Sequence, residues 1–140
     1  MNAIVECVPN ISEGRDTDLI GSIVDAARID GCSILSVEPD ADYNRTVITL
    51  AGDPEAVARA ATELSVEAIH RIDMRNHSGE HPRLGVVDVC PFIPIQGIDM
   101  EACATLAAKV GSNVAERTGA PVYLYGASAS SPSRTKLSSL

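Results

Sequence analysis

The chain has 140 residues, of which 45% are hydrophobic, and its formal net charge is −8 at pH 7. This length and apolar content suffice for a domain with a buried core. The acidic balance argues against a nucleic-acid or anionic-membrane surface, because both need clustered lysine and arginine. The apolar runs are too short to span a membrane, and the N-terminus lacks the basic start of a signal peptide, so we expect a cytoplasmic protein.

Apolar runs bounded by turn residues predict strands, and apolar residues at helical spacing predict helices. In chain order the elements are a strand at 4–10, a helix at 19–29, strands at 32–39 and 45–52, a helix at 55–72, a strand at 84–95 that Pro91 and Pro94 break, a helix at 100–118 and a strand at 121–126. Asp53 and Asp99 are the expected N-terminal caps of the second and third helices. The first six elements have the ferredoxin-like order. We therefore expect an α+β fold: a ferredoxin-like βαββαβ core with an added αβ unit, and a mixed or antiparallel sheet covered by helices.

The chain contains no obvious linker, so residues 1–126 are expected to form one domain. Residues 127–140 are small and polar and predict a flexible, truncated tail. The cysteines form no C-x-x-C pair, and we interpret them as free, mostly buried thiols. They are Cys7, Cys32, Cys90 and Cys103.

The segment NHSGEHPRLGVVDVC (76–90) carries two of the three histidines of the chain. His77 and His81 have the i, i+4 spacing of two metal ligands on one helix face, but Gly79 and Pro82 oppose a helix there. A metal site is therefore a weak alternative. A polar loop with no chemical role is a second alternative.

A catalytic loop is the third interpretation of this segment. A histidine held over the end of a sheet can take and give a proton near neutral pH. We prefer His81 to His77 for this role, because Pro82 stiffens its position. Glu80 could orient the imidazole, and Arg83 could bind a carboxylate through two hydrogen bonds.

Four segments of the chain resemble one known family. They are VECVPNISEGRD (5–16), NRTVITLAG (44–52), IDMRNHSGEHPRLGVVDVCPFIPIQG (72–97) and PVYLYG (121–126). They resemble the N-terminal subdomain of glutamate formiminotransferase, the folate-dependent transferase of histidine degradation, and the resemblance covers residues 1–134. It implies transfer of a formimino group from N-formimino-L-glutamate to N5 of tetrahydrofolate, a co-substrate, with no metal.

The resemblance also implies roles for individual residues. The general-base histidine of the family falls on His81, an acidic position of the family falls on Glu38, and Asn44 and Arg45 match its Asn-Arg-Thr motif and are expected to bind substrate. Glu80 and Arg83 are added to the expected substrate-binding residues on the chemistry of their side chains. A carboxylate near the cationic formimino carbon would stabilise the transition state. Glu80 or Asp88 could supply it, although Asp88 lies within a predicted strand and could equally be structural. Asn44 could instead shape a turn, and Arg45 could be a surface charge.

Active members of the family have a second subdomain, and folate binds in the groove between the two. By this resemblance we expect the sequence to stop about where that part would begin. We therefore expect a half-enzyme that acts with a missing C-terminal subdomain, a second chain or a homo-oligomeric partner. The alternative is a catalytically inactive stand-alone subdomain that binds folate or a protein partner.

Overall fold

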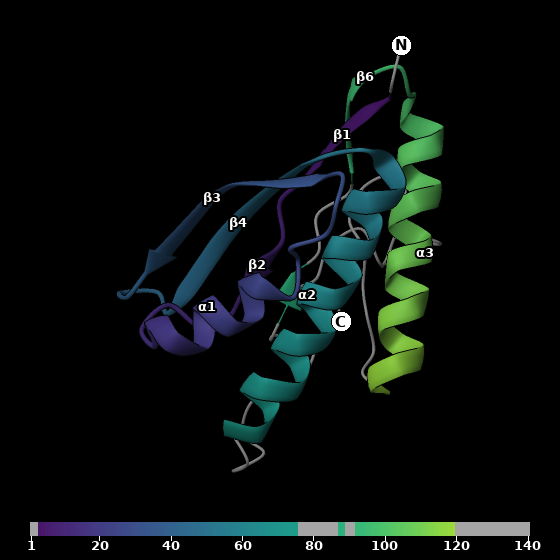
Figure 1. The fold of residues 1–140 in the computed structure, drawn as a ribbon. Coiled ribbons are helices and arrows are strands. Elements are labelled where there is room, and N and C mark those ends of the chain that lie inside the picture. Colours follow the sequence, from purple (N-terminus) through teal and green to yellow (C-terminus); the bar gives the residue numbers. More distant parts are fainter. Residues whose placement is uncertain (1–2, 76–86, 89–91, 120–140) are drawn as a thin grey trace.

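The computed structural model describes residues 3–75, 87–88 and 92–119, which form an α+β fold as predicted (Figure 1). The elements in chain order are β1 (Ile4–Cys7), β2 (Asn10–Ile11), α1 (Thr17–Asp25), β3 (Cys32–Asp40), β4 (Arg45–Gly52), α2 (Pro54–Arg75), β5 (Val87–Asp88), β6 (Ile93–Gln96) and α3 (Met100–Thr118). The strand predicted at 121–126 and the tail at 127–140 lie outside the described residues. No helix in the described ranges is long and apolar enough to cross a membrane.

The described strands form one sheet in which every pair is antiparallel. β4 pairs with β3 along one side and with both β1 and β2 along the other. β1 pairs in turn with β6, and β2 pairs with β5. Across the sheet the order is therefore β3, β4, then β1 with β2, then β6 with β5. The ferredoxin-like topology of the core and its added αβ unit stay predictions.

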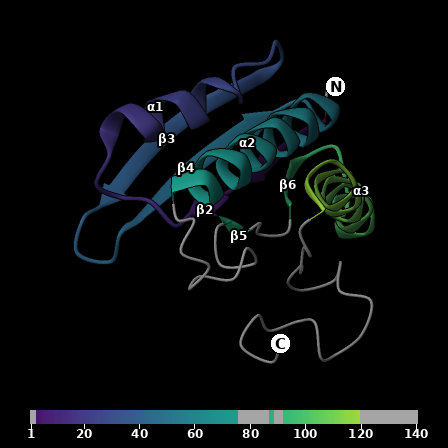
Figure 2. The same ribbon diagram turned by 90° about the horizontal axis from the view of Figure 1, so that it is seen from below.

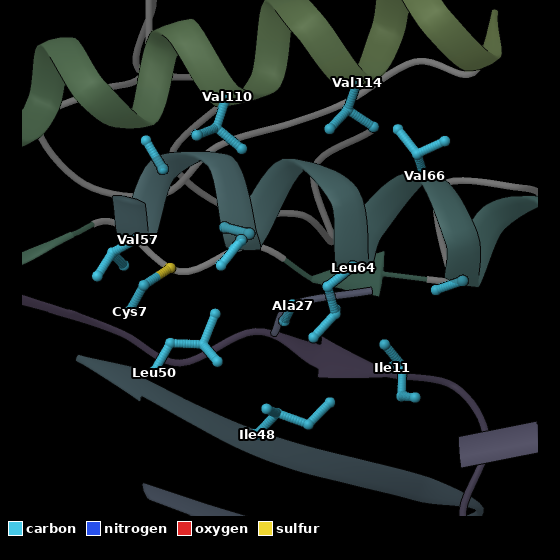
Figure 3. Packing of buried hydrophobic residues seen from close by; sticks show 14 of the residues in the cluster. Cys7, Ile11, Ala27, Ile48, Leu50, Val57, Leu64, Val66, Val110 and Val114 are labelled. Atoms are coloured by element: carbon cyan, nitrogen blue, oxygen red, sulfur yellow. The ribbon is translucent and has the colours of Figure 1, made fainter. Parts of the chain in front are cut away.

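The helices pack together on one face of this sheet. α2 lies across β1 and β4, α1 packs beside it, and α3 packs against α2 and β6 (Figure 2). The core between helices and sheet is built from aliphatic side chains, including Ile48 and Leu50 of β4 and Val57 and Leu64 of α2 (Figure 3). Phe92 is the largest side chain in it and is fully buried.

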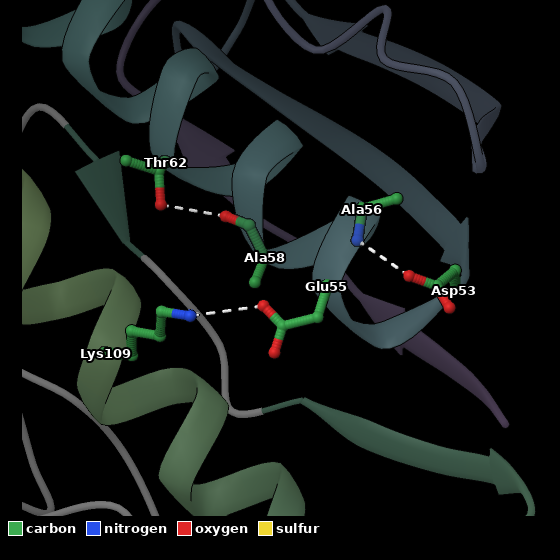
Figure 4. A network of polar contacts seen from close by, with 6 residues as sticks. All are labelled: Asp53, Glu55, Ala56, Ala58, Thr62 and Lys109. Atoms are coloured by element: carbon green, nitrogen blue, oxygen red, sulfur yellow. Dashed lines mark hydrogen bonds and ion pairs between the residues drawn. The ribbon is translucent and has the colours of Figure 1, made fainter.

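The second and third helices begin at the predicted caps. The Asp53 carboxylate accepts a hydrogen bond from the Ala56 backbone N–H at 3.1 Å (Figure 4). Asp99 caps α3 in the same way through the Ala102 N–H, and Gly119 ends that helix in the left-handed conformation with φ of 73°. α2 continues to Arg75, beyond its predicted end at residue 72.

The exposed sides of α2 and α3 are joined by two ion pairs. Lys109 Nζ contacts Glu55 Oε2 at 3.1 Å (Figure 4). About two helical turns further along, Arg117 forms a fork with both carboxylate oxygens of Glu63, at 2.6 and 3.1 Å. This arrangement lowers the pKa of Glu63, mainly through the hydrogen bond from Arg117.

The structure corrects the predicted bounds of the first strand and of the first helix. The strand expected at 4–10 is divided into β1 and β2, because Pro9 has no N–H to donate to the ladder. Its carbonyl still accepts a hydrogen bond from the Ile48 N–H, so β4 follows both halves. The strand predicted at 84–95 is described in two parts, β5 and β6.

The first helix spans Thr17–Asp25 instead of 19–29. It starts earlier because the Asp16 side chain accepts a hydrogen bond from the Leu19 N–H. It ends earlier because the N–H groups of Ala26, Ala27 and Arg28 bond three residues back, which tightens the chain into turns.

Candidate active site

The sheet face that points away from the helices carries Glu38 and Arg45, two of the candidate site residues that the structure places. Along β1 and β2 the odd-numbered residues from Val5 to Ile11 are buried, whereas the even-numbered ones are only partly buried. β4 alternates in the same way, with Thr46, Ile48 and Leu50 buried. We call the surface formed by the other residues the far face. It is defined by Ile4, Glu6, Val8 and Asn10 of β1 and β2 and their connection, and by Arg45, Val47, Thr49 and Ala51 of β4.

One row of residues crosses four adjacent strands at this face. Glu38 of β3 is opposite Val47 of β4, and Val47 is opposite Asn10 of β2. Asn10 is in turn opposite Asp88 of β5. Neighbouring strands are about 4.8 Å apart, so the backbones of Glu38 and Asn10 are roughly 10 Å apart. The pairing therefore places Glu38 and Asp88, two acidic residues considered from the sequence, in one row.

A hollow of about 450 Å³ lies at the Glu38 end of this row. Its lining residues are Glu38, Pro39, Asp40, Ala41, Asp42 and Val47. Asp40 is engaged by the local turn, since its carboxylate accepts hydrogen bonds from the N–H groups of Asp42 and Tyr43. The lining side chains include three acidic residues and no basic residue, so the hollow itself is acidic, although Arg15 and Arg45 lie at the same turn.

Asn44 holds the turn between β3 and β4 against the loop that precedes α1. Its backbone is left-handed, with φ of 51°, a conformation that asparagine tolerates better than most residues. Its Oδ1 accepts a hydrogen bond from the Gly14 N–H at 2.9 Å. The turn-shaping interpretation of Asn44 thus has direct geometric support, whereas its predicted contact with substrate stays a prediction.

Glycine is required at position 14 because the loop before α1 passes very close to the backbone of the β3–β4 hairpin. A Cβ at this position would lie 2.3 Å from the Asp40 carbonyl oxygen and 2.5 Å from the Arg45 nitrogen. Both are backbone atoms that cannot move aside easily. The close approach of two backbones therefore explains the glycine, and it locks the loop to the hairpin that carries Glu38.

Glu13 and Thr46 reinforce this junction, and the sequence did not single out either. The Glu13 side chain is buried and accepts hydrogen bonds from the Arg15 and Asp16 N–H groups at 3.0 and 2.9 Å. The buried Thr46 hydroxyl donates to the Glu13 carbonyl at 2.5 Å. The only signal in the sequence was the position of Glu13 beside Gly14, just ahead of a helix cap.

Arg45 starts β4 and is exposed at the end of the hairpin, opposite Asp40 of β3. This place is compatible with the surface-charge interpretation, and its predicted role in substrate binding stays a prediction. Arg15, which the sequence did not single out, reaches the same turn: its Nε donates to the Ala41 carbonyl at 2.9 Å.

The histidine loop, which we define as residues 76–86, lies outside the described residues, so the roles of His77, Glu80, His81 and Arg83 stay predictions. Both ends of the loop are described. α2 ends at Arg75, and the chain is next described at Val87, where β5 pairs with β2. The loop therefore rejoins the sheet next to Asn10, at the opposite end of the row from Glu38.

The described residues offer little support for a metal site or for a reactive cysteine. They contain no group of three histidine, cysteine or acidic side chains suited to a metal ion, and His70 is exposed on α2. The three cysteines in the described ranges, Cys7, Cys32 and Cys103, are thiols and not disulfides, as predicted, and Cys90 lies outside those ranges. Burial raises the pKa of the Cys32 and Cys103 thiols, which disfavours the reactive thiolate.

The fold and the site define an α+β domain whose helices cover one sheet face and whose polar row crosses the other. Residues 4–140 match the family described as "Formiminotransferase domain, N-terminal subdomain". The chain belongs to this family, as the resemblance predicted.

Individual relatives agree with this assignment. The chain is 47% identical over 139 residues to a glutamate formimidoyltransferase of Thermoplasma acidophilum and 42% identical over 138 residues to one of Streptococcus pyogenes. It is 46% identical over 138 residues to the formimidoyltransferase-cyclodeaminase of Rattus norvegicus. These alignments cover 98–99% of this chain, but only 46% of the two microbial proteins and 26% of the rat protein. The chain therefore spans about half or a quarter of the relatives it matches.

Proposed function

We propose that this chain forms the N-terminal half of a glutamate formimidoyltransferase active site. The reaction moves a formimino group from N-formimino-L-glutamate to N5 of tetrahydrofolate, a step of histidine degradation in the cytoplasm. The observation that carries the proposal is the family match from residue 4 to residue 140. The names of the microbial relatives support the transfer of a formimidoyl group, and the folate acceptor follows from the resemblance.

His81 is the general base in this proposal. N5 of the folate forms a bond to the formimino carbon and loses its proton to the imidazole. The bond from that carbon to the glutamate nitrogen then breaks, and the imidazolium returns the proton to the departing nitrogen. A single histidine thus serves as base and then as acid, which suits an imidazole because its pKa lies near neutrality.

Glu38 is proposed to stabilise the positive charge of the formimino group. This carboxylate is exposed on the hairpin and borders the acidic hollow. A fixed negative charge beside an amidinium favours both its binding and the charged transition state. Glu80 and Arg83 belong to the chain between α2 and β5, and in this proposal Arg83 pairs with a substrate carboxylate.

The far face also suits the flat ring of a folate. It combines apolar area from Val47 and Ala51 with the polar groups of the row, and the 43%-exposed Ile93 of β6 adjoins it opposite Glu6. A heteroaromatic ring with polar edges needs both kinds of contact. The ring would require a second wall, and the part of the relatives that this chain does not match is the natural source of it. That part could come from the rest of a longer protein, a separate chain or a second copy.

A second candidate function is a binding module without catalysis. In this alternative the fold binds its ligand but does not supply the positioning on which much of the rate of such a transfer depends. Such a module would bind folate or a protein partner through the same far face.

Titration calorimetry and a transfer assay on the purified chain separate these functions. The half-enzyme proposal predicts that the chain binds N-formimino-L-glutamate and that Glu38→Gln weakens this binding. Glu116→Gln is the matched control, because Glu116 is exposed on α3 and remote from the far face. Folate binding with no measurable affinity for N-formimino-L-glutamate would instead support the binding module.

A further inference from the structure

Asn10 occupies the middle of the Glu38–Asp88 row, and neither the family assignment nor the proposed mechanism gives it a role. It lies on β2, flanked by Val47 on one side and Asp88 on the other. Its side chain belongs to the far face and is only partly buried. It is thus the polar residue between the exposed Glu38 and the point where the histidine loop rejoins the sheet.

The carboxamide of Asn10 is held in a defined orientation. Its Nδ2 donates a hydrogen bond to the Val8 carbonyl at 3.2 Å. A carbonyl oxygen can only accept, so the nitrogen must be the atom that faces Val8. This contact restrains the side chain and leaves Oδ1 to act as an acceptor toward the far face.

We propose that Asn10 Oδ1 accepts a hydrogen bond from an N–H of the formimino group and so makes Asn10 a specificity-determining residue for the transfer. This inference rests on the proposed function and deepens it. The formimino group is an amidinium, with N–H donors on both of its nitrogens. A neutral formyl group has an oxygen in place of one of them and can only accept there.

In this proposal Glu38 and Asn10, on different strands, both accept hydrogen bonds from the cationic formimino group. Glu38 supplies charge from β3, and Asn10 supplies an uncharged acceptor from β2, two strands away. The backbone separation of roughly 10 Å allows both side chains to reach inward toward a group bound over Val47. An acceptor of this kind discriminates strongly, because an analogue with oxygen instead of N–H places two acceptors against each other.

The test compares the affinity of the chain for N-formimino-L-glutamate and N-formyl-L-glutamate by titration calorimetry. The wild type is expected to prefer the formimino compound. Asn10→Ala should reduce this preference by about tenfold to a hundredfold, the range for loss of a hydrogen bond to a charged group. Asn113→Ala, the same change at an exposed position of α3, should leave it unchanged. Thermal unfolding of each variant shows that it is folded.

The outcomes distinguish the role of Asn10 from the proposed function. A wild type that prefers the formimino compound, together with an Asn10→Ala variant of equal preference, would overturn the role of Asn10 and leave the proposed function standing. A wild type that binds neither compound would overturn both. If Asn10→Ala does not fold, Asn10→Ser replaces it, because serine is smaller and its hydroxyl cannot span the same distance.

Discussion

Replacement of Asn44 tests how the hairpin that carries Glu38 is held in place. Asn44→Ala removes the hydrogen bond between Oδ1 and the N–H of the buried Gly14, a loss of about 1–3 kcal/mol in free energy of unfolding. It also leaves alanine in a left-handed conformation with φ of 51°, which adds about 1 kcal/mol. The variant should therefore be about 2–4 kcal/mol less stable than the wild type in urea unfolding.

Two further variants divide this effect into its causes. Asn44→Gly also loses the hydrogen bond but adopts the left-handed conformation without strain, so it should be less damaging than alanine. Asn44→Asp keeps an acceptor for the Gly14 N–H and should lose less than about 1 kcal/mol. The reasoning is refuted if Asn44→Ala unfolds within about 0.5 kcal/mol of the wild type, the range of an ordinary surface substitution, or if aspartate is as damaging as alanine.

Two other predictions concern the helices. Among the described residues, the fully buried Ser65 has a hydroxyl without a hydrogen-bond partner, so Ser65→Ala should leave thermal stability unchanged or raise it by up to about 1 kcal/mol; a loss above that size would show a missed contact. The ion pair of Glu63 with Arg117 is more than one-third exposed and should contribute at most about 1 kcal/mol. Because the pKa of Glu63 is lowered in the folded state, this contribution is present above its ordinary value of 4.5 and is lost as pH falls below it. Unfolding of wild type and Glu63→Gln at pH 7 and pH 3 checks this, and a difference that grows on acidification would contradict it.

Among the elements of the fold, the helices are the ones that the sequence predicts best. α3 spans the predicted residues because Asp99 and Gly119 mark its two ends with side-chain and backbone chemistry. The prediction for α1 is wrong at both ends because apolar spacing reports burial and not conformation. Ala27 is fully buried although it lies beyond the end of the helix. The apolar pattern therefore continues after the hydrogen bonding has changed.

The arrangement of the candidate site residues is harder to predict from the sequence than the fold. The sequence indicates Glu38 and Asp88 separately, but their common row depends on strand register, which hydrogen bonding between distant segments determines. Glu13 escapes prediction for a similar reason, since its burial follows from docking against a hairpin residue 33 positions further along the chain. From the sequence, Asn44 could either bind substrate or shape a turn. Only the structure supplies its contact with Gly14.

The central claim is that this chain supplies the histidine half of a formimidoyltransferase site, and a chimaera tests it most directly. The chain replaces the matching segment of the Thermoplasma acidophilum enzyme, to which it is 47% identical. Transfer of the formimino group from N-formimino-L-glutamate to tetrahydrofolate is then measured, with His81→Ala as the comparison. The account predicts transfer by the chimaera and its loss in His81→Ala without loss of folding. A folded chimaera that transfers nothing, or a His81→Ala variant with the unaltered rate, would contradict it.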